Sequence, residues 1–308
     1  MLLAPSLQAA ELSPAKLLAA GRVDDAIVTL QNRIAATPND AESENLLCRA
    51  YLALTNWDAS IAACQKAVAL EPENAEYHLW LGRAYGEKAD HSSFFTATGL
   101  AKKVRSEFEA AVRLDPSNVE ARADLADFYV EAPGIVGGGI DKAATQAQQL
   151  VPLDPAEAHL VRAQIAEKDN DQAAAEREFR AAIQTSGGRP GPWMDLARFY
   201  RRTNRFDEMQ AAIQQATSAQ NNRHVLLAAA EILILTQRNL PAAGELLRRY
   251  LASETVEDAP AFKAHYLLGS LLEQQGDTRG AAQEYRNALS LARDFSPAQD
   301  ALKRLDRR

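Results

Sequence analysis

Small and larger residues recur along the chain with a period of about 34 residues. Each period holds a small residue, a second small residue twelve positions later, a larger one after four more and another small one after a further three. In residues 41–74 these are Cys48, Ser60, Cys64 and Ala67, and in residues 262–293 they are Gly269, Ala281, Tyr285 and Ala288. The pattern predicts pairs of helices, with small residues on both helices that let the backbones approach to roughly 8–10 Å.

This spacing resembles the tetratricopeptide repeat, a helix–turn–helix unit of about 34 residues. The resemblance implies an all-α, right-handed α-solenoid of about eight such units over residues 13–295, with a capping helix over residues 296–308. We expect the bulky residue of each second helix to reach the first helix of the next unit. We also expect an open trough along the concave side, without an enclosed pocket.

Two adjacent units are longer than the period. The distance from Pro72 to Pro116 is 44 residues, and that from Pro116 to Pro155 is 39. The excess falls between the paired helices, at residues 87–103 and 132–140. Since the turns of stacked units lie along one edge, we expect the two insertions to be neighbours on a binding face.

The two insertions carry apolar residues in otherwise polar or glycine-rich sequence. The first holds Phe94 and Phe95, and the second holds Ile135 and Val136 beside Gly137 to Gly139. One interpretation is that the phenylalanines cover Ile135 and Val136 and that the loops pack on each other. The alternative is a small apolar or lipid-like ligand bound between the insertion loops.

Composition narrows the class of protein. The 308 residues carry a formal net charge of −7, and 47% of them are hydrophobic. These values fit a folded chain with its own core, and the acidic balance argues against a nucleic-acid partner. No apolar run reaches the ~18 residues that a membrane helix needs, so we expect no transmembrane segment.

Residues 1–12 lie outside the repeat register. They are apolar and end in small residues, like the end of a secretory signal peptide, but they lack its basic start. We interpret them as a truncated signal peptide or as a disordered leader. The first interpretation predicts a periplasmic or secreted protein of bacterial type, and the second a cytoplasmic one.

The only two cysteines, Cys48 and Cys64, belong to the two helices of one unit and are expected to face each other. As reduced thiols they are small core residues. In an oxidising compartment they can form a disulfide, since their Cα atoms are expected within ~7 Å. The sequence leaves both states open.

Three histidines recur with the repeat. His78, His159 and His265 fall on the fourth position of their units, counted so that Cys48 is at position 8. This placement indicates a packing role and spreads the three rings over different units. Because helical HExxH, CxxC and GxSxG patterns are absent, we expect no catalytic site, no metal and no cofactor.

The resemblance also implies where a partner binds. In this family ligands usually lie along the concave side, against positions five, nine and twelve of the first helices. In this sequence those positions include Asn45, Arg49, Arg83, Asp127, Arg198 and Arg201. Arg49 and Arg83 are suited to an acidic peptide segment, because a guanidinium binds a carboxylate bidentately; a solvated polar groove is the alternative. The chain is therefore expected to be a non-catalytic scaffold for a segment of another protein.

Overall fold

The computed structural model describes residues 12–307, so the expected leader lies almost entirely outside the described residues. The described chain forms eight helical pairs and one final helix, α17 (Ser296–Leu305), and it contains no β-strand. The pairs are α1 (Pro14–Ala19) and α2 (Val23–Ala36), α3 (Ala41–Ala53) and α4 (Trp57–Leu70), α5 (Ala75–Asp90) and α6 (Phe94–Leu114), α7 (Val119–Glu131) and α8 (Ile140–Leu150), α9 (Pro155–Lys168) and α10 (Gln172–Thr185), α11 (Gly191–Arg202) and α12 (Phe206–Ser218), α13 (Arg223–Leu235) and α14 (Leu240–Leu251), and α15 (Ala261–Gln274) and α16 (Thr278–Leu291). The predicted all-α solenoid of eight units with a capping helix is confirmed.

Local sequence signals set the helix boundaries. Many helices begin after an Asp or Asn whose side chain accepts a hydrogen bond from a backbone N–H of the first turn. These caps include Asp40, Asn56, Asn74, Asn118, Asp154, Asp171 and Asp277. Several turns within a pair reverse at a residue with positive φ, such as Asn170, Asn204 and Gly276, since these residue types tolerate the left-handed region best.

The small and bulky positions of the repeat meet inside one unit. A Cβ atom on Gly269 of α15 would lie 2.7 Å from the Tyr285 ring of α16, and one on Gly82 of α5 would collide with the Phe108 ring of α6. The ring fills the space left by the missing side chain, which brings the paired helices into close contact.

The predicted contact of the bulky residue with the next unit is present as well. The Phe179 ring of α10 lies 5.4 Å from the Phe199 ring of α11, centroid to centroid. Tyr285 of α16 packs with Ala301 of α17.

Cys48 and Cys64 occupy the same two places in the second unit, and there they form a disulfide between α3 and α4. Their Cα atoms lie 5.2 Å apart, within the range that a disulfide needs. Of the two states left open by the sequence, the structure contains the bonded one.

The first insertion lengthens helices instead of forming a loop. Residues 87–90 extend α5, and α6 already begins at Phe94, so only residues 91–93 form the turn. The second insertion contains a short 3₁₀ helix, η1 (Gly134–Val136), which lies against α6. There the Arg105 guanidinium donates a hydrogen bond to the Val136 carbonyl at 3.3 Å.

The predicted packing of the insertion residues on each other is wrong. Val136 is buried, but Phe94, Phe95 and Ile135 are 73%, 88% and 75% exposed. The two phenylalanine rings contact each other edge to face, with centroids 5.8 Å apart. Because α6 already begins at Phe94, both rings lie at its exposed start and do not cover Ile135.

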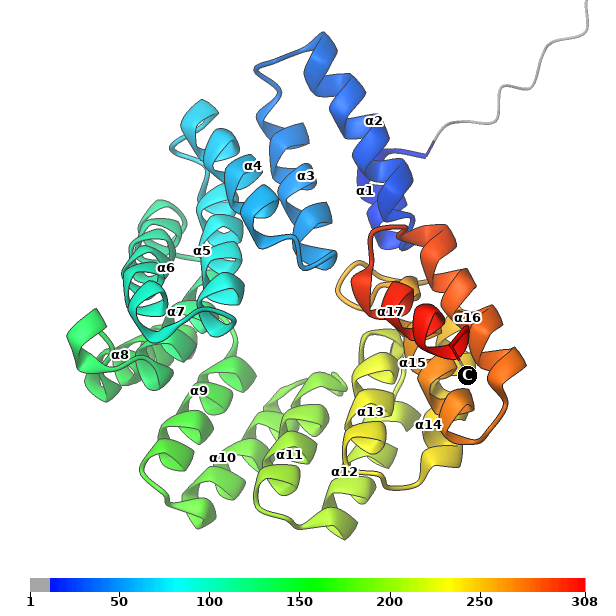
Figure 1. Cartoon of the computed structure of the whole chain (residues 1–308). Helices are drawn as coiled ribbons and strands as arrows, with labels where there is room; N and C mark the ends of the chain where they lie inside the picture. The colour runs from blue at the N-terminus through cyan, green and yellow to red at the C-terminus, as the bar shows by residue number, and fades with distance from the viewer. Residues whose placement is uncertain (1–11, 308) are drawn as a thin grey trace, which may run out of the picture.

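The two ends of the solenoid meet, so the expected open trough is closed by the chain itself (Figure 1). Leu17 and Leu18 of α1 share one apolar core with Phe262 of α15 and Phe295 before α17. Gly21 makes the closest approach, because a Cβ atom there would lie 2.9 Å from the Ala261 nitrogen. Figure 1 shows the consequence: the helical pairs run around a ring in which the blue N-terminal helices lie beside the red C-terminal ones.

Candidate binding site on the inner face

The first helix of each pair faces the inside of the ring and the second helix lies outside (Figure 1). Most successive first helices contact one another, as α3 does with α5 and α7 with α9. The inner surface is therefore made by α3, α5, α7, α9, α11, α13 and α15. Side chains three to four residues apart on these helices form a continuous inward stripe.

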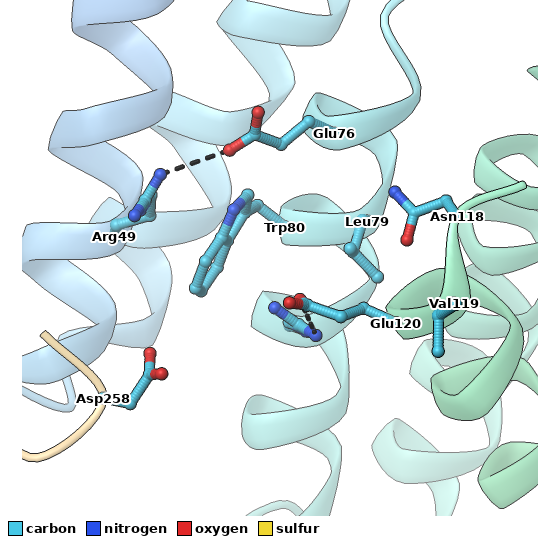
Figure 2. A pocket seen from close by; sticks show the side chains of 9 residues that line it. Arg49, Glu76, Leu79, Trp80, Asn118, Val119, Glu120 and Asp258 are labelled. Carbon is cyan, nitrogen blue, oxygen red and sulfur yellow. Dashed lines mark hydrogen bonds and ion pairs between the residues drawn. The ribbon is translucent and has the colours of Figure 1, made fainter. Parts of the chain in front are cut away.

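A cavity of about 840 Å³ opens on this surface between α3, α5 and α7 (Figure 2). Trp80 of α5 lies at its centre, and the loop between α14 and α15 closes one side with Asp258. The Trp80 ring contacts the guanidinium groups of Arg49 and Arg83, at 4.6 and 4.8 Å from the ring centroid. Such cation–π contacts hold both arginines against the indole.

Each of these arginines is also paired with carboxylates of this chain. Arg49 donates to Glu257 at 2.8 and 2.7 Å and to Glu76 at 3.2 Å. The structure thus brings the predicted Arg49 into one site with a carboxylate from the far end of the chain. The contact with Glu257 is bidentate, the geometry in which a guanidinium binds a carboxylate most specifically.

Arg83 makes the corresponding contacts on the other side of Trp80. It donates to Asp124 at 2.6 Å and to Glu120 at 3.1 Å, both on α7. Burial lowers and these two carboxylates raise the pKa of Arg83, with a net upward shift. Both arginines of the site are therefore occupied by acidic side chains of the protein itself.

The other predicted site residues do not line the cavity around Trp80. Asn45 is buried in α3 instead of lining the groove, and the Nε atom of Arg201 is buried as well. Asp127 reaches the inner surface and accepts a hydrogen bond from Gln164 at 3.2 Å. Arg198 pairs with Asp195 on its own helix at 2.7 Å, and neither residue lines the cavity around Trp80.

Further around the ring the inner surface carries closely spaced carboxylates. Asp127 is exposed by surface area, but the protein around it partly desolvates its carboxylate, and this effect together with the charges of Glu131, Asp124 and Asp90 raises its pKa to about 6. Burial, together with Asp195 and Asp154, raises the pKa of Glu157 on α9 to about 7. The negative charges of this surface are therefore incompletely balanced by the positive charges around them.

The sequence reasoning missed Trp80, Asp124, Glu257 and Asp258. Of the predicted residues at position nine, Arg49 and Arg83 line the cavity around Trp80. Asn45 at position five and the Nε atom of Arg201 at position twelve are buried, whereas Glu76 and Trp80 at positions two and six line the cavity. Positions two, six and nine of a first helix lie on one helical face, so the position of Arg49 and Arg83 could have indicated Trp80 and Asp124 at position six. No local signal pointed to Glu257.

The described residues form an α-solenoid of stacked helical pairs, which is the architecture of a helical-repeat protein. Three models of the tetratricopeptide repeat match the sequence, one at residues 17–84, one at residues 136–190 and 235–300, and one at residues 191–223. The chain belongs to the tetratricopeptide repeat family. Residues 85–135, which hold most of the longest unit and the start of the second insertion, lie outside these matches. No match was found among curated protein sequences.

Solved structures with the same fold include yeast Tom70, with 15% identity and a TM-score of 0.57 over 99% of this chain and 66% of that chain. A thermophilic TPR protein of Thermus thermophilus, TTC0263, is 17% identical, with a TM-score of 0.46 over 72% of this chain and 97% of that one. MamA is 20% identical, with a TM-score of 0.43 over 53% of this chain and 88% of that one. At these identities the likeness concerns the fold alone.

Proposed function

We propose that this protein is a non-catalytic scaffold that holds a segment of another protein against its inner face. The observation that carries the proposal is the cavity around Trp80, which is lined by first helices of three successive units. Helical-repeat surfaces of this kind present extended concave faces to partners. An aromatic ring at the centre of such a surface supplies the contact area on which binding energy is concentrated.

The charges around Trp80 favour a basic partner segment over an acidic one. Arg49 and Arg83 face five carboxylates, counting those that line the cavity and those that hold the arginines: Glu76, Glu120, Asp124, Glu257 and Asp258. An acidic segment would have to displace carboxylates already bonded to both guanidinium groups. A segment with Lys or Arg side chains instead adds the positive charge that this surface lacks.

The disulfide bears on where the scaffold works. A bond between Cys48 and Cys64 persists in oxidising compartments and is rare where thiols are kept reduced. It supports a periplasmic or secreted location for the scaffold. None of the described helices is long and apolar enough to span a membrane.

The proposal is tested with two fluorescein-labelled peptides of equal length, one alternating Arg and Leu and the other Glu and Leu. Fluorescence anisotropy should show saturable binding of the Arg peptide, weakening as salt is raised. Neutralising Glu76 and Glu120 together (E76Q/E120Q) should weaken this binding. The control variant Asp141→Asn, on the outer helix α8, should leave it unchanged. Preference for the Glu peptide, or equal loss in both variants, contradicts the proposed site.

A further inference from the structure

In four of the eight units a polar residue at the fourth position of the first helix is hydrogen-bonded to the second helix. The imidazole Nδ1 of His78 lies 2.6 Å from Glu107, that of His159 lies 2.7 Å from Glu178, and that of His265 lies 2.6 Å from Glu284. In each case the glutamate immediately precedes the bulky residue of the second helix. In the fourth unit Arg122 and Gln146 occupy the same two places, and they are hydrogen-bonded at 3.0 Å.

The second unit breaks this pairing. Its fourth position is Glu44, and the residue that precedes Cys64 on the second helix is Ala63, which has no polar side chain. Glu44 is only 2% exposed. Its Oε2 atom has no hydrogen-bond partner among residues 12–307. A buried carboxylate oxygen without a donor is costly, so this position is a place where an outside donor would be stabilised.

A cavity of about 440 Å³ lies where the missing partner would be, between α2, α3 and α4. Glu44 lines it, and most of the remaining wall is apolar, with Ile34, Ala35, Leu47, Ala59 and Ala62. At its edge Gln31 donates a hydrogen bond to the Tyr51 hydroxyl at 3.2 Å. The site thus combines an apolar chamber with one buried negative group, which is the composition of a small-molecule pocket.

Lys66 covers part of this site. Its Nζ atom lies 3.4 Å from Oε1 of Glu44, while its side chain is 67% exposed. A single long contact from a largely solvated ammonium holds the lysine loosely. It also shows which chemistry the carboxylate accepts, since the group that approaches it is a primary ammonium.

We propose that the cavity between α2, α3 and α4 binds a small primary amine in its protonated form, with an apolar body of a few carbon atoms. The ammonium donates to Oε2 of Glu44 and replaces the polar partner that the second helix supplies in other units. The apolar body lies against Ile34, Leu47 and the alanines of α4. This site is on the opposite side of α3 from the Trp80 cavity and does not depend on the proposed scaffold function.

Isothermal titration calorimetry with hexylammonium at pH 7 tests this site, with 1-hexanol as the uncharged probe of equal length. Hexylammonium should bind with one site per chain, and 1-hexanol at least about tenfold more weakly, because a hydrogen bond to a charged group is worth about one power of ten or more. Glu44→Gln should reduce hexylammonium binding by a similar factor. Lys66→Met should strengthen it, since the competing ammonium is gone. Glu42→Gln, on the same helix but at an exposed side chain, is the matched control and should change nothing.

A double variant separates loss of the site from loss of the fold. E44H/A63E recreates the His–Glu pair of the third, fifth and eighth units, so the melting temperature should not fall while hexylammonium binding disappears. Equal affinity for hexylammonium and 1-hexanol, or unchanged binding in Glu44→Gln, would overturn the proposal. So would binding of Nα-acetyl-lysine methylamide with no binding of hexylammonium, because the occupant would then be a lysine side chain of a partner.

Discussion

Arg49 of α3 and Glu257 of the loop between α14 and α15 are joined by two hydrogen bonds, although 208 residues separate them. The contact ties the second unit of the solenoid to the turn before its eighth unit. The Thr255 hydroxyl, in the same loop, donates to the carbonyl of Ala19 at 2.8 Å. Together with the shared apolar core, these contacts hold the ring closed.

The Arg49–Glu257 pair should contribute measurably to stability. Because both side chains are largely shielded from solvent, Arg49→Met should lower the free energy of unfolding by about 1–3 kcal/mol and leave Glu257 without its main partner. Glu257→Gln should cost less, since the amide keeps one acceptor. The double variant should cost little more than Arg49→Met alone, a coupling that urea denaturation can measure. If the losses of stability in the two single variants simply added up in the double variant, the contact would not form in solution.

Two glycines of α5 should respond oppositely to alanine. Gly82→Ala forces a methyl group against the Phe108 ring, so it should destabilise the protein by about 1–3 kcal/mol. Gly86 has open space around its Cβ position, so Gly86→Ala should stabilise it by about 0.5–1 kcal/mol through helix propensity. Thermal and urea unfolding of the two single variants decide this. A change in the free energy of unfolding of the same sign in both variants would contradict the packing of α5 on α6.

Reduction of the Cys48–Cys64 disulfide should destabilise the protein. The bond closes a short loop, with a sequence separation of 16, and loops of this size are associated with about 3 kcal/mol. Urea unfolding with and without a phosphine reductant gives the difference, and C48A/C64A should show no effect of the reductant. Two free thiols in the denatured, unreduced protein would show that the bond is not formed.

Stability should fall as the pH rises through the range in which Glu157 loses its proton. Its pKa is raised from 4.5 to about 7 in the folded protein, so between these values the folded state binds a proton that the unfolded state has released. The free energy of unfolding therefore decreases with rising pH over that window. Glu157→Gln should remove this dependence and stabilise the protein at pH 8 by about 1 kcal/mol, after allowance for solvent screening. If the free energy of unfolding of Glu157→Gln depended on pH between pH 5 and 7 as steeply as that of the wild type, this assignment would be refuted.

Asp127 offers a second measurement on the same surface. Its pKa is raised from 3.8 to about 6, so Asp127→Asn should flatten the lower part of the same pH profile. A bound basic peptide should draw both pKa values down and release protons. Calorimetry in two buffers of different ionisation enthalpy measures that release.

Much of the fold was predictable because a helical repeat is specified locally. The small residue at Gly82 or Gly269, the bulky ring sixteen or more residues later and the capping Asp or Asn each act within one unit. Eight consecutive repetitions of these signals fixed the number of helical pairs and the capping helix. The positions of Arg49 and Arg83 were also predictable, since one helical face recurs in every unit.

The candidate site was predictable only in part. Arg49 and Arg83 were found from their position, but their carboxylate partners were not, because a charged residue in sequence carries no sign of which opposite charge it meets. The first insertion was misjudged for a related reason. Residues 94–103 include weak helix formers such as Thr96 and Gly99, yet they belong to α6, just as residues 87–90 belong to α5. The added length became helix and left Phe94 and Phe95 exposed.

The sequence by itself determined the repeated unit, since its contacts join residues a few turns apart along the chain. Only the tertiary structure decided the ring, because small rotations between successive units accumulate around the whole solenoid. Whether Gly21 meets Ala261, and Arg49 meets Glu257, depends on the sum of all those rotations. No single repeat encodes that sum, and so the closed inner face emerges only when all eight units are packed together.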